Sequence, residues 1–240
     1  MNKYINKTYN TKYYGKVTVL EYLSYKKVLL LFNNTGHKGH YRMDKVLEGN
    51  IKDPLHKSVA GVGFFGVGKC KSTDKAYSVW SSMLERCYSS TGHLSNKNDS
   101  YFTKVSVCSE WHDYQNFAEW FNLNYEKGYQ LDKDLLYKDN NQYCPDKCCM
   151  LPAELNAVLI NNKGYTNDLP VGVTYHKRDK VYVAQCSNGD FVQHIGNYQD
   201  LDIAKKAYRE FKKERIISLL TKHPSLCDSI QIALLNYEPY

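Results

Sequence analysis

The sequence predicts an α+β protein in three parts, because its hydrophobic period changes along the chain. Residues 1–71 contain short alternating and apolar runs of strand length, which predict a small β-rich N-terminal unit. Residues 72–164 carry apolar side chains at helical spacing around a hairpin-like stretch, which predicts a helical centre with a ββα segment. Residues 165–240 contain three strand-like runs before a long helical pattern. They predict a three-stranded antiparallel sheet packed on one helix, with a short C-terminal helix after it.

Composition narrows both the class of protein and the class of partner. The 240 residues carry a formal net charge of +7, a moderate excess that favours a polyanionic partner without requiring one. No window of about 18 uninterrupted apolar residues occurs, so no membrane partner is expected. The polar, aromatic start has no hydrophobic signal region. The 8 cysteines are therefore expected as reduced thiols in a cytoplasmic protein.

Two features of the N-terminal unit raise ligand hypotheses. His37 and His40 lie three residues apart in TGHKGHY, but no carboxylate or cysteine stands beside them, so a plain loop is favoured over metal ligation. The stretch AGVGFFGVGK ends with Lys69 followed by Cys70, which departs from the phosphate-binding P-loop pattern. A tight turn or an interdomain joint is the better interpretation of these glycines.

The centre of the chain reads as two helices and a ββα segment. Helical spacing of Tyr77, Trp80 and Leu84 predicts the first helix. An aromatic stripe over residues 111–121 predicts the second, and its rings fall on one face, which favours a core over a base-stacking surface. LDKDLLY, KDNNQ and YCPDKCCML then give a strand, a turn and a return strand. Pro152 suits the first position of the helix that follows.

Strand alternation in the C-terminal module assigns two faces to its sheet. It puts the small side chains of Ala184 and Cys186 beneath the helix. Asn188-Gly189 predicts the turn between the second and third strands, and Asp200 predicts the N-cap of the helix. The polar side chains expected on the open face are Thr174, His176, Gln185, Ser187 and His194. The first hairpin adds three cations within reach of a DNA backbone, Lys177, Arg178 and Lys180.

Three motifs of the centre carry a resemblance to a known family. They are W-x-x-M-x-x-R-C-Y at residues 80–88, V-C-x-E-W at residues 107–111, and the segment 131–156. Together they resemble a group of phage proteins related to HNH homing endonucleases. The resemblance implies an HNH-like ββα finger that holds one divalent metal. It places a histidine general base at the end of the first strand, an asparagine in the turn and a His or Asn ligand on the helix.

The residues at those positions depart from the family pattern. Lys133 stands where the resemblance places the histidine, Lys147 near the asparagine of the turn, and Asn156 at the helix position. A lysine ammonium repels a divalent cation, and it is a poor base at neutral pH unless burial lowers its pKa strongly. The sequence therefore favours a finger without nuclease activity.

Two chemistries stay open for this finger. A surviving nuclease would hold Mg²⁺ through the carboxylates of Asp132 and Asp134, with His112 as the base. The favoured alternative is a finger kept for its shape, whose lysines contact DNA phosphates. Those lysines are Lys133, Lys138 and Lys147.

Cysteines offer a second metal hypothesis. A tetrahedral zinc site could draw on Cys87, Cys108, Cys144 and Cys148. The C-x3-C-C spacing at residues 144–149 departs from paired C-x2-C motifs, so buried thiols are favoured over zinc. No cofactor follows from the sequence with certainty: magnesium is expected only for a nuclease.

A spaced pattern in the C-terminal module carries the second resemblance. It consists of VGV at residues 171–173, VAQ at 183–185, Ile195-Gly196 and the helical AKKAY. This pattern is similar to the plant APETALA-two (ethylene-response-factor-like) DNA-binding domain, of which phage homing endonucleases carry related copies. The resemblance implies three strands in the DNA major groove with the helix behind them. The family reads bases with several arginines and tryptophans, whereas this module offers only Arg178, so specificity could be weak, shape-based or lost.

These observations lead to one favoured function and two alternatives. The favoured function is a phage protein of the host cytoplasm that binds double-stranded DNA and derives from a homing-endonuclease scaffold, without catalytic activity. The first alternative is a divergent Mg²⁺-dependent HNH-type endonuclease. The second is an anti-defence protein that binds a host immune protein, with which the 22 tyrosines are compatible as interface anchors.

Overall fold

The computed structural model describes residues 2–89, 104–159, 169–187 and 192–238. Its 34% helix and 26% strand confirm the α+β class, and the predicted three-stranded antiparallel sheet followed by a long helix is present. The chain forms two compact units, residues 1–122 and 123–240. The three predicted domains stay a prediction, because close packing alone does not show which segments fold independently. Within the described ranges, no helix is long and apolar enough to cross a membrane.

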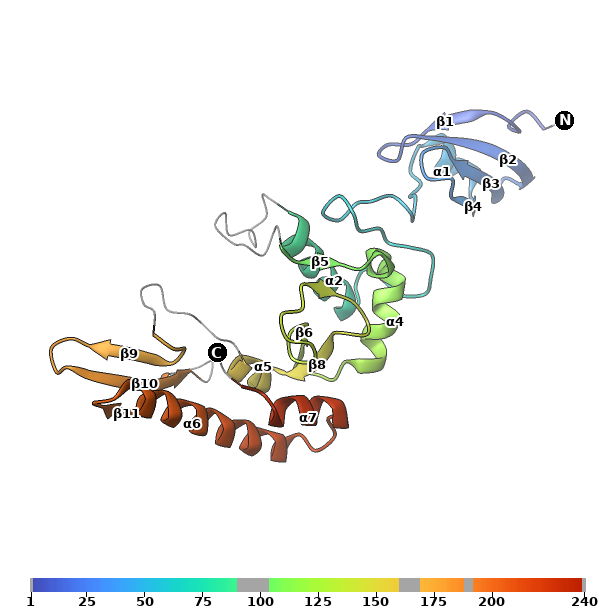
Figure 1. Cartoon of the computed structure of the whole chain (residues 1–240). Coiled ribbons are helices and arrows are strands. Elements are labelled where there is room, and N and C mark those ends of the chain that lie inside the picture. The colour runs from blue at the N-terminus through green and yellow to red at the C-terminus, as the bar shows by residue number, and fades with distance from the viewer. Residues whose placement is uncertain (1, 90–103, 160–168, 188–191, 239–240) are drawn as a thin grey trace. The chain divides into compact units, whose positions relative to one another are not determined.

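A four-stranded antiparallel sheet begins the first unit (Figure 1). Its strands, adjacent in chain order, are β1 (Thr8–Asn10), β2 (Lys16–Ser24), β3 (Lys27–Phe32) and β4 (Lys38–Tyr41). Alternate residues of β2 and β3 are buried, as a half-buried sheet requires. They pack with the short helix α1 (Met43–Leu47) into a separate small core. β4 forms one edge of the sheet.

Aromatic packing holds the second half of the first unit together. Its elements are α2 (Lys75–Tyr88), β5 (Ser106–Val107), the 3-10 helix η1 (Ser109–His112) and α4 (Tyr114–Asn124). Trp80, Trp111 and Tyr114 are fully buried, and Trp80 Nε1 donates a hydrogen bond of 2.7 Å to the carbonyl of Trp111. The prediction that the aromatic stripe belongs to the core is therefore confirmed.

The glycine-rich segment at residues 60–69 packs closely against the helices. A Cβ at Gly66, where φ is +74°, would lie 1.9 Å from Asp113 Oδ1, and one at Gly68 would lie 2.2 Å from Gln115 Oε1. The Gln115 amide in turn bonds the backbone of Phe65 and Cys70. These glycines are thus needed for close approach of backbone to side chain.

A hairpin and a helix open the second unit. The described elements are β6 (Tyr129–Asp132), β7 (Gln142–Tyr143), β8 (Cys149–Pro152) and α5 (Ala153–Leu159). β6 and β8 pair antiparallel, with Asp132 opposite Cys149 and Tyr129 opposite Pro152. The predicted start of the helix at Pro152 is wrong by one residue. Pairing continues through Pro152, because the next N–H, that of Ala153, bonds the carbonyl of Gly128 at 3.2 Å.

The rest of the second unit is a sheet and two helices (Figure 1). The elements are β9 (Val173–His176), β10 (Val181–Ser187), β11 (Val192–Tyr198), α6 (Leu201–Lys222) and α7 (Asp228–Leu235). Asp200 caps α6 by accepting a bond of 3.0 Å from Ile203 N, as predicted. The predicted Asn188-Gly189 turn lies outside the described residues. Leu151 and Leu155 of the hairpin and helix share one core with Ile216 of α6 and Ile230 of α7.

Candidate nucleic-acid interface

Helix α6 covers one face of the sheet β9–β10–β11 and leaves the other open. Ala184 and Cys186 of β10 are buried against Tyr208 of α6, which confirms the two faces that alternation predicts. Gly172, with φ +79°, lies so close to the Tyr208 ring that an added Cβ would come within 2.1 Å of it. Small residues at these positions therefore let the helix approach the sheet.

Strand register determines which side chains share the open face. On β9 and β10, Thr174 lies opposite Val183 and His176 opposite Val181. On β10 and β11, Gln185 lies opposite His194, next to an irregularity in register between Ala184 and Gln185. Alternation puts all of these on the face away from α6. Thr174, His176 and His194 are exposed, and Gln185 is partly buried. Ser187 pairs with Val192 in the strand register.

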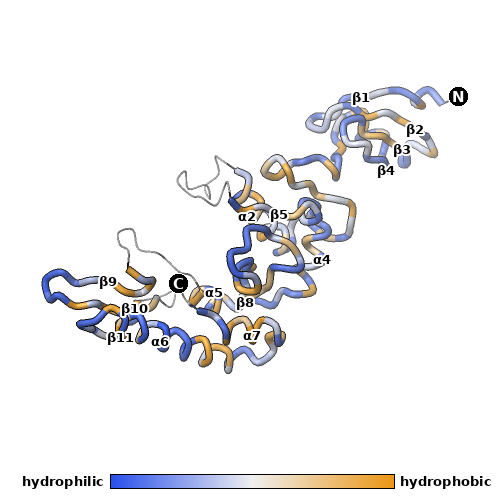
Figure 2. Tube along the Cα trace, viewed as in Figure 1, coloured by the Kyte–Doolittle hydropathy of each residue, from blue (hydrophilic) through white to orange (hydrophobic). Residues whose placement is uncertain are grey.

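The hairpin between β9 and β10 carries three cations, and its trace is hydrophilic in Figure 2. Lys177, Arg178 and Lys180 are all exposed, and 91% of the Arg178 side chain is accessible. Asp179 is the one carboxylate among them: its oxygens lie 3.0 Å from His176 Nδ1 and 3.9 Å from Arg178 Nε. The hairpin therefore keeps an excess of positive charge, and its guanidinium is reachable by a large partner.

Sequence reasoning missed four members of the open face. One is Val192 of β11, which is exposed and lies two residues before His194 in the alternation of that strand. Val181 and Val183 contribute partly buried apolar patches to this face, and Asn197, opposite Val183, adds an exposed amide from β11. The strand alternation that identifies Gln185 also predicts these residues. The prediction considered only polar side chains, so it left out the valines, and it did not extend past the register irregularity to Asn197.

The three central lysines differ in exposure. Lys138 is exposed and Lys147 is partly buried, whereas Lys133 is buried. The Lys133 ammonium donates a hydrogen bond of 2.8 Å to the carbonyl of Asn140 and is paired with the carboxylate of Asp134. The Lys133 ammonium is therefore hydrogen-bonded inside the protein and is not exposed to a partner.

The carboxylates proposed for magnesium are also engaged in the loop after β6. Asp132 Oδ1 accepts bonds from the backbone N–H groups of Asp134 at 3.0 Å and Leu135 at 2.8 Å. Burial raises the pKa of Asp132, and these two hydrogen bonds oppose that rise. One oxygen of the Asp134 carboxylate is paired with the Lys133 ammonium, which puts a positive charge beside any cation that this carboxylate would bind.

His112, the candidate base, belongs to the first unit. Burial lowers the pKa of its imidazole, which a backbone hydrogen bond at Val107 partly offsets. Its ring packs edge-on against Tyr88 at 5.9 Å between centroids, and among the described residues Nε2 has no hydrogen-bond partner. The histidine is therefore held neutral in an aromatic setting.

The cysteines proposed for zinc are thiols in the structure. Cys87, Cys144 and Cys148 are buried and Cys108 is partly buried. In the part of the chain that the structure describes, no three His, Cys, Asp or Glu side chains come together as a metal site would require.

Comparison with known proteins adds no identification. No protein-family model, no curated protein and no solved structure matches the chain.

Proposed function

We propose that this protein binds double-stranded DNA through the open face of the sheet β9–β10–β11. One observation carries the proposal: the strand register gathers polar side chains of all three strands on a face that α6 leaves uncovered. The cationic hairpin at residues 177–180 continues that face. A three-stranded sheet with such a face has the dimensions to enter a major groove, as β-sheet readers of DNA do.

The side chains on this face suggest how much sequence it could read. Gln185 can pair with an adenine edge, and Thr174 can bond either base type or contact a thymine methyl. Arg178 is the only arginine at the face, so bidentate guanine contacts are few. We therefore expect binding dominated by phosphate contacts, with weak sequence preference and steep salt dependence.

The same proposal includes an inactive ββα segment, derived from an HNH homing-endonuclease scaffold of a phage. It is supported by the ammonium of Lys133, which is bonded to Asp134. A divalent metal on that carboxylate would either displace the Lys133 ammonium or lie close to it, and two positive charges so close together repel each other.

A titration of labelled duplex DNA against three proteins tests the binding face. The test variant replaces Lys177, Arg178 and Lys180 by glutamine; the control replaces Lys206, Arg209 and Lys213, exposed cations on α6, and so changes the net charge equally. We expect the hairpin variant to lose about tenfold or more in affinity, with a shallower salt slope, and the helix variant to change about twofold at most. Equal losses in both variants, or no binding at low salt, would contradict the proposed face.

Supercoiled plasmid with and without Mg²⁺ tests the inactive segment. We expect a mobility shift without nicking in either condition. Metal-dependent nicking that disappears in Asp134→Ala would replace this part of the proposal by the endonuclease alternative.

A further inference from the structure

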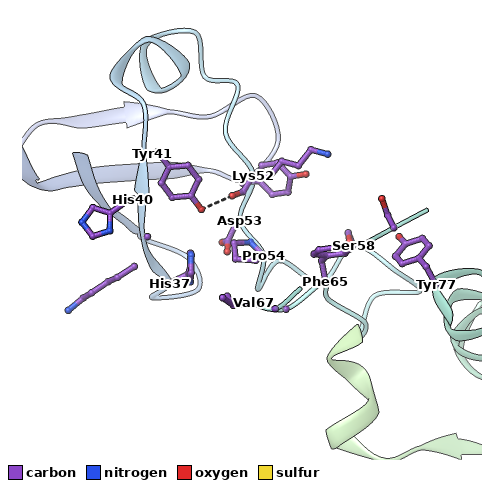
Figure 3. A pocket seen from close by; sticks show the side chains of 16 residues that line it. His37, His40, Tyr41, Lys52, Asp53, Pro54, Ser58, Phe65, Val67 and Tyr77 are labelled. Carbon is purple, nitrogen blue, oxygen red and sulfur yellow. Dashed lines mark hydrogen bonds between the residues drawn. The ribbon is translucent and has the colours of Figure 1, made fainter. Parts of the chain in front are cut away.

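A pocket of about 770 Å³ lies in the first unit beside the edge strand β4 (Figure 3). One part of its lining comes from the sheet and the residues just after it, among them His37, Lys38 and Lys52. Another part comes from the glycine-rich segment and the start of α2, with Phe65 and Tyr77. A volume of this size is typical of sites for small organic ligands, for which the usual range is about 300–1,000 Å³.

The sheet side of the pocket presents positive charge through Lys52, which is exposed. Lys38 also lines the pocket, but alternation puts its side chain on the face of β4 opposite Tyr41, whose ring packs on the buried Phe32. The one carboxylate in the lining, Asp53, is buried, and it is used internally: its oxygens accept bonds from Thr35 Oγ1 at 2.6 Å and from Leu55 N at 3.0 Å. Burial raises the pKa of Tyr41 to about 12, with a smaller contribution from Asp53. This phenol therefore stays neutral and does not repel an anion.

The opposite side presents fixed aromatic rings. Phe65 and Tyr77 both pack on the buried Tyr114, with ring centroids 5.3 and 5.1 Å from it. Tyr77 also packs on Trp80 at 5.5 Å. Rings held in this way lose little conformational freedom when a ligand binds. The free energy gained by stacking on them is therefore not offset by an entropy cost of ordering the side chains.

Hydrogen bonds join the two sides into one site. Tyr41 donates through its hydroxyl to the carbonyl of Lys52 at 3.0 Å. Gly66 N donates to the carbonyl of Pro54 at 2.8 Å, and Gln115 holds Phe65 through its carbonyl at 3.1 Å. The path from β4 to the aromatic side is thus bonded at each step within the first unit.

We propose that this pocket binds a nucleotide, with the base against Phe65 and Tyr77 and the phosphate toward Lys52. Every base offers a π-face to an aromatic ring, and stacking combined with cations is the way in which proteins hold single-stranded nucleic acid. The ligand is a nucleoside phosphate, either as a small molecule or as one residue of a single strand. This site is separate from the duplex-binding face, and it adds a second kind of nucleic-acid contact to the protein.

An acidic peptide is the competing occupant, since β4 is an edge strand that could pair with another strand. Such a peptide would use Lys52 but has no need of the fixed rings. The aromatic side therefore favours the nucleotide, and a peptide probe distinguishes the two.

The experiment uses the full chain and two lysine variants. Lys52→Gln alters the pocket, and Lys26→Gln changes an exposed lysine in the turn between β2 and β3. Binding is followed by anisotropy of a fluorescein-labelled oligothymidylate of about 12 nucleotides, a length within the usual range for single-strand sites. ATP and thymidine 5′-monophosphate serve as competitors, and a labelled octaglutamate serves as the peptide probe.

We expect the pocket variant to bind the oligonucleotide about tenfold more weakly and the turn variant to change about twofold at most. A third variant, Phe65→Leu, keeps an apolar side chain without a ring and is expected to lose about fivefold or more, since stacking contributes about 1–3 kcal/mol per base. Competition by the mononucleotides at similar affinity identifies a free nucleotide as the ligand; competition only by unlabelled oligonucleotide identifies a single strand.

Three results would overturn this site: equal losses in the two lysine variants, full binding by Phe65→Leu, or octaglutamate binding as tight as oligonucleotide binding. The hairpin variant of Lys177, Arg178 and Lys180 separates this proposal from duplex binding. It is expected to keep oligonucleotide binding in the pocket while losing affinity for duplex DNA.

Discussion

Lys133 and Asn140 exchange hydrogen bonds in both directions. The Lys133 ammonium donates to the Asn140 carbonyl over 2.8 Å, and the Asn140 side-chain amide donates to the Lys133 carbonyl over the same distance. The Asn140 amide also donates to the carbonyl of Gln142 at 2.8 Å. Both residues are buried, so the pair fixes the loop after β6 from inside. Lys133 therefore has a structural role in this loop.

Replacing Lys133 by methionine tests this role. The change keeps the aliphatic stem but leaves the buried carbonyl of Asn140 without its donor, which costs about 1–3 kcal/mol. We expect a loss of that size in the free energy of urea unfolding, followed by circular dichroism. This method is chosen because the three tryptophans lie at positions 80, 111 and 120, so their fluorescence does not report on the second unit. Duplex affinity is expected to change about twofold at most, since this ammonium is engaged internally.

Lys138→Met is the matched control, because Lys138 is exposed in the same loop. It is expected to leave stability within about 0.5 kcal/mol, as surface substitutions usually do. A larger loss of DNA affinity in Lys133→Met than in Lys138→Met, without loss of stability, would assign Lys133 to the phosphates instead.

The local pattern of the sequence was sufficient for the C-terminal sheet. Alternation has a period of two, so the burial of Ala184 and Cys186 follows from their position relative to Thr174 and Gln185 once the strands are recognised. The Asp200 cap is equally local, because its partner Ile203 is three residues away. Such features can be read from neighbouring residues alone.

Features that depend on distant contacts were not accessible in this way. The burial of Lys133 depends on how the loop closes on Asn140, seven residues later. The glycines at 66 and 68 are explained by Asp113 and Gln115, which lie more than forty residues away in the sequence. A glycine-rich stretch has the same sequence pattern whether it forms a turn, binds phosphate or makes room for a side chain. Only the tertiary contacts distinguish these three roles.

Gly172→Ala and Gly128→Ala form a pair that separates backbone strain from crowding. Both glycines have positive φ, +79° and +92°, but an added Cβ at Gly172 would meet Tyr208, whereas one at Gly128 would meet nothing within 4 Å. We expect Gly128→Ala to cost about 1–2 kcal/mol from strain alone. Gly172→Ala is expected to cost a further 1–3 kcal/mol or so from overpacking against the ring. Equal losses in urea unfolding would show that α6 can shift to make room.

Gln115→Leu tests whether one amide organises the glycine-rich segment. The change removes the bonds to Phe65 and Cys70 and leaves backbone groups unsatisfied, so we expect a loss of about 2–4 kcal/mol. Tryptophan fluorescence during urea unfolding measures it, because all three tryptophans are in the first unit. Asn116→Ala, an exposed neighbour with one bond to Glu110, is expected to cost about 1 kcal/mol at most. Similar losses in both variants would mean that the segment is held by other contacts.

Lys212 is expected to make the stability of the second unit depend on pH. Its ammonium is buried, 3.2 Å from the Tyr208 hydroxyl and 5.4 Å from the ring centroids of both Tyr208 and Tyr237. Burial lowers its pKa from the ordinary 10.5 to about 8. Between these two values the unfolded chain binds the proton and the folded chain does not, so the contribution of Lys212 to stability rises with pH across about 8 to 10.5. Below about pH 8 both states are protonated, and the cost of the buried charge is fully present.

Lys212→Met is therefore expected to stabilise the second unit at pH 7, by about 3 kcal/mol at most, and to remove the rise above pH 8 that this side chain causes. Urea unfolding followed by circular dichroism at pH 7, 8, 9 and 10 measures the difference from the unchanged protein. Lys213→Met, one residue later and exposed, should leave the rise in place because its ammonium stays in water in both states. If the difference in stability between Lys212→Met and the unchanged protein is the same at every pH, the pKa of Lys212 is not lowered.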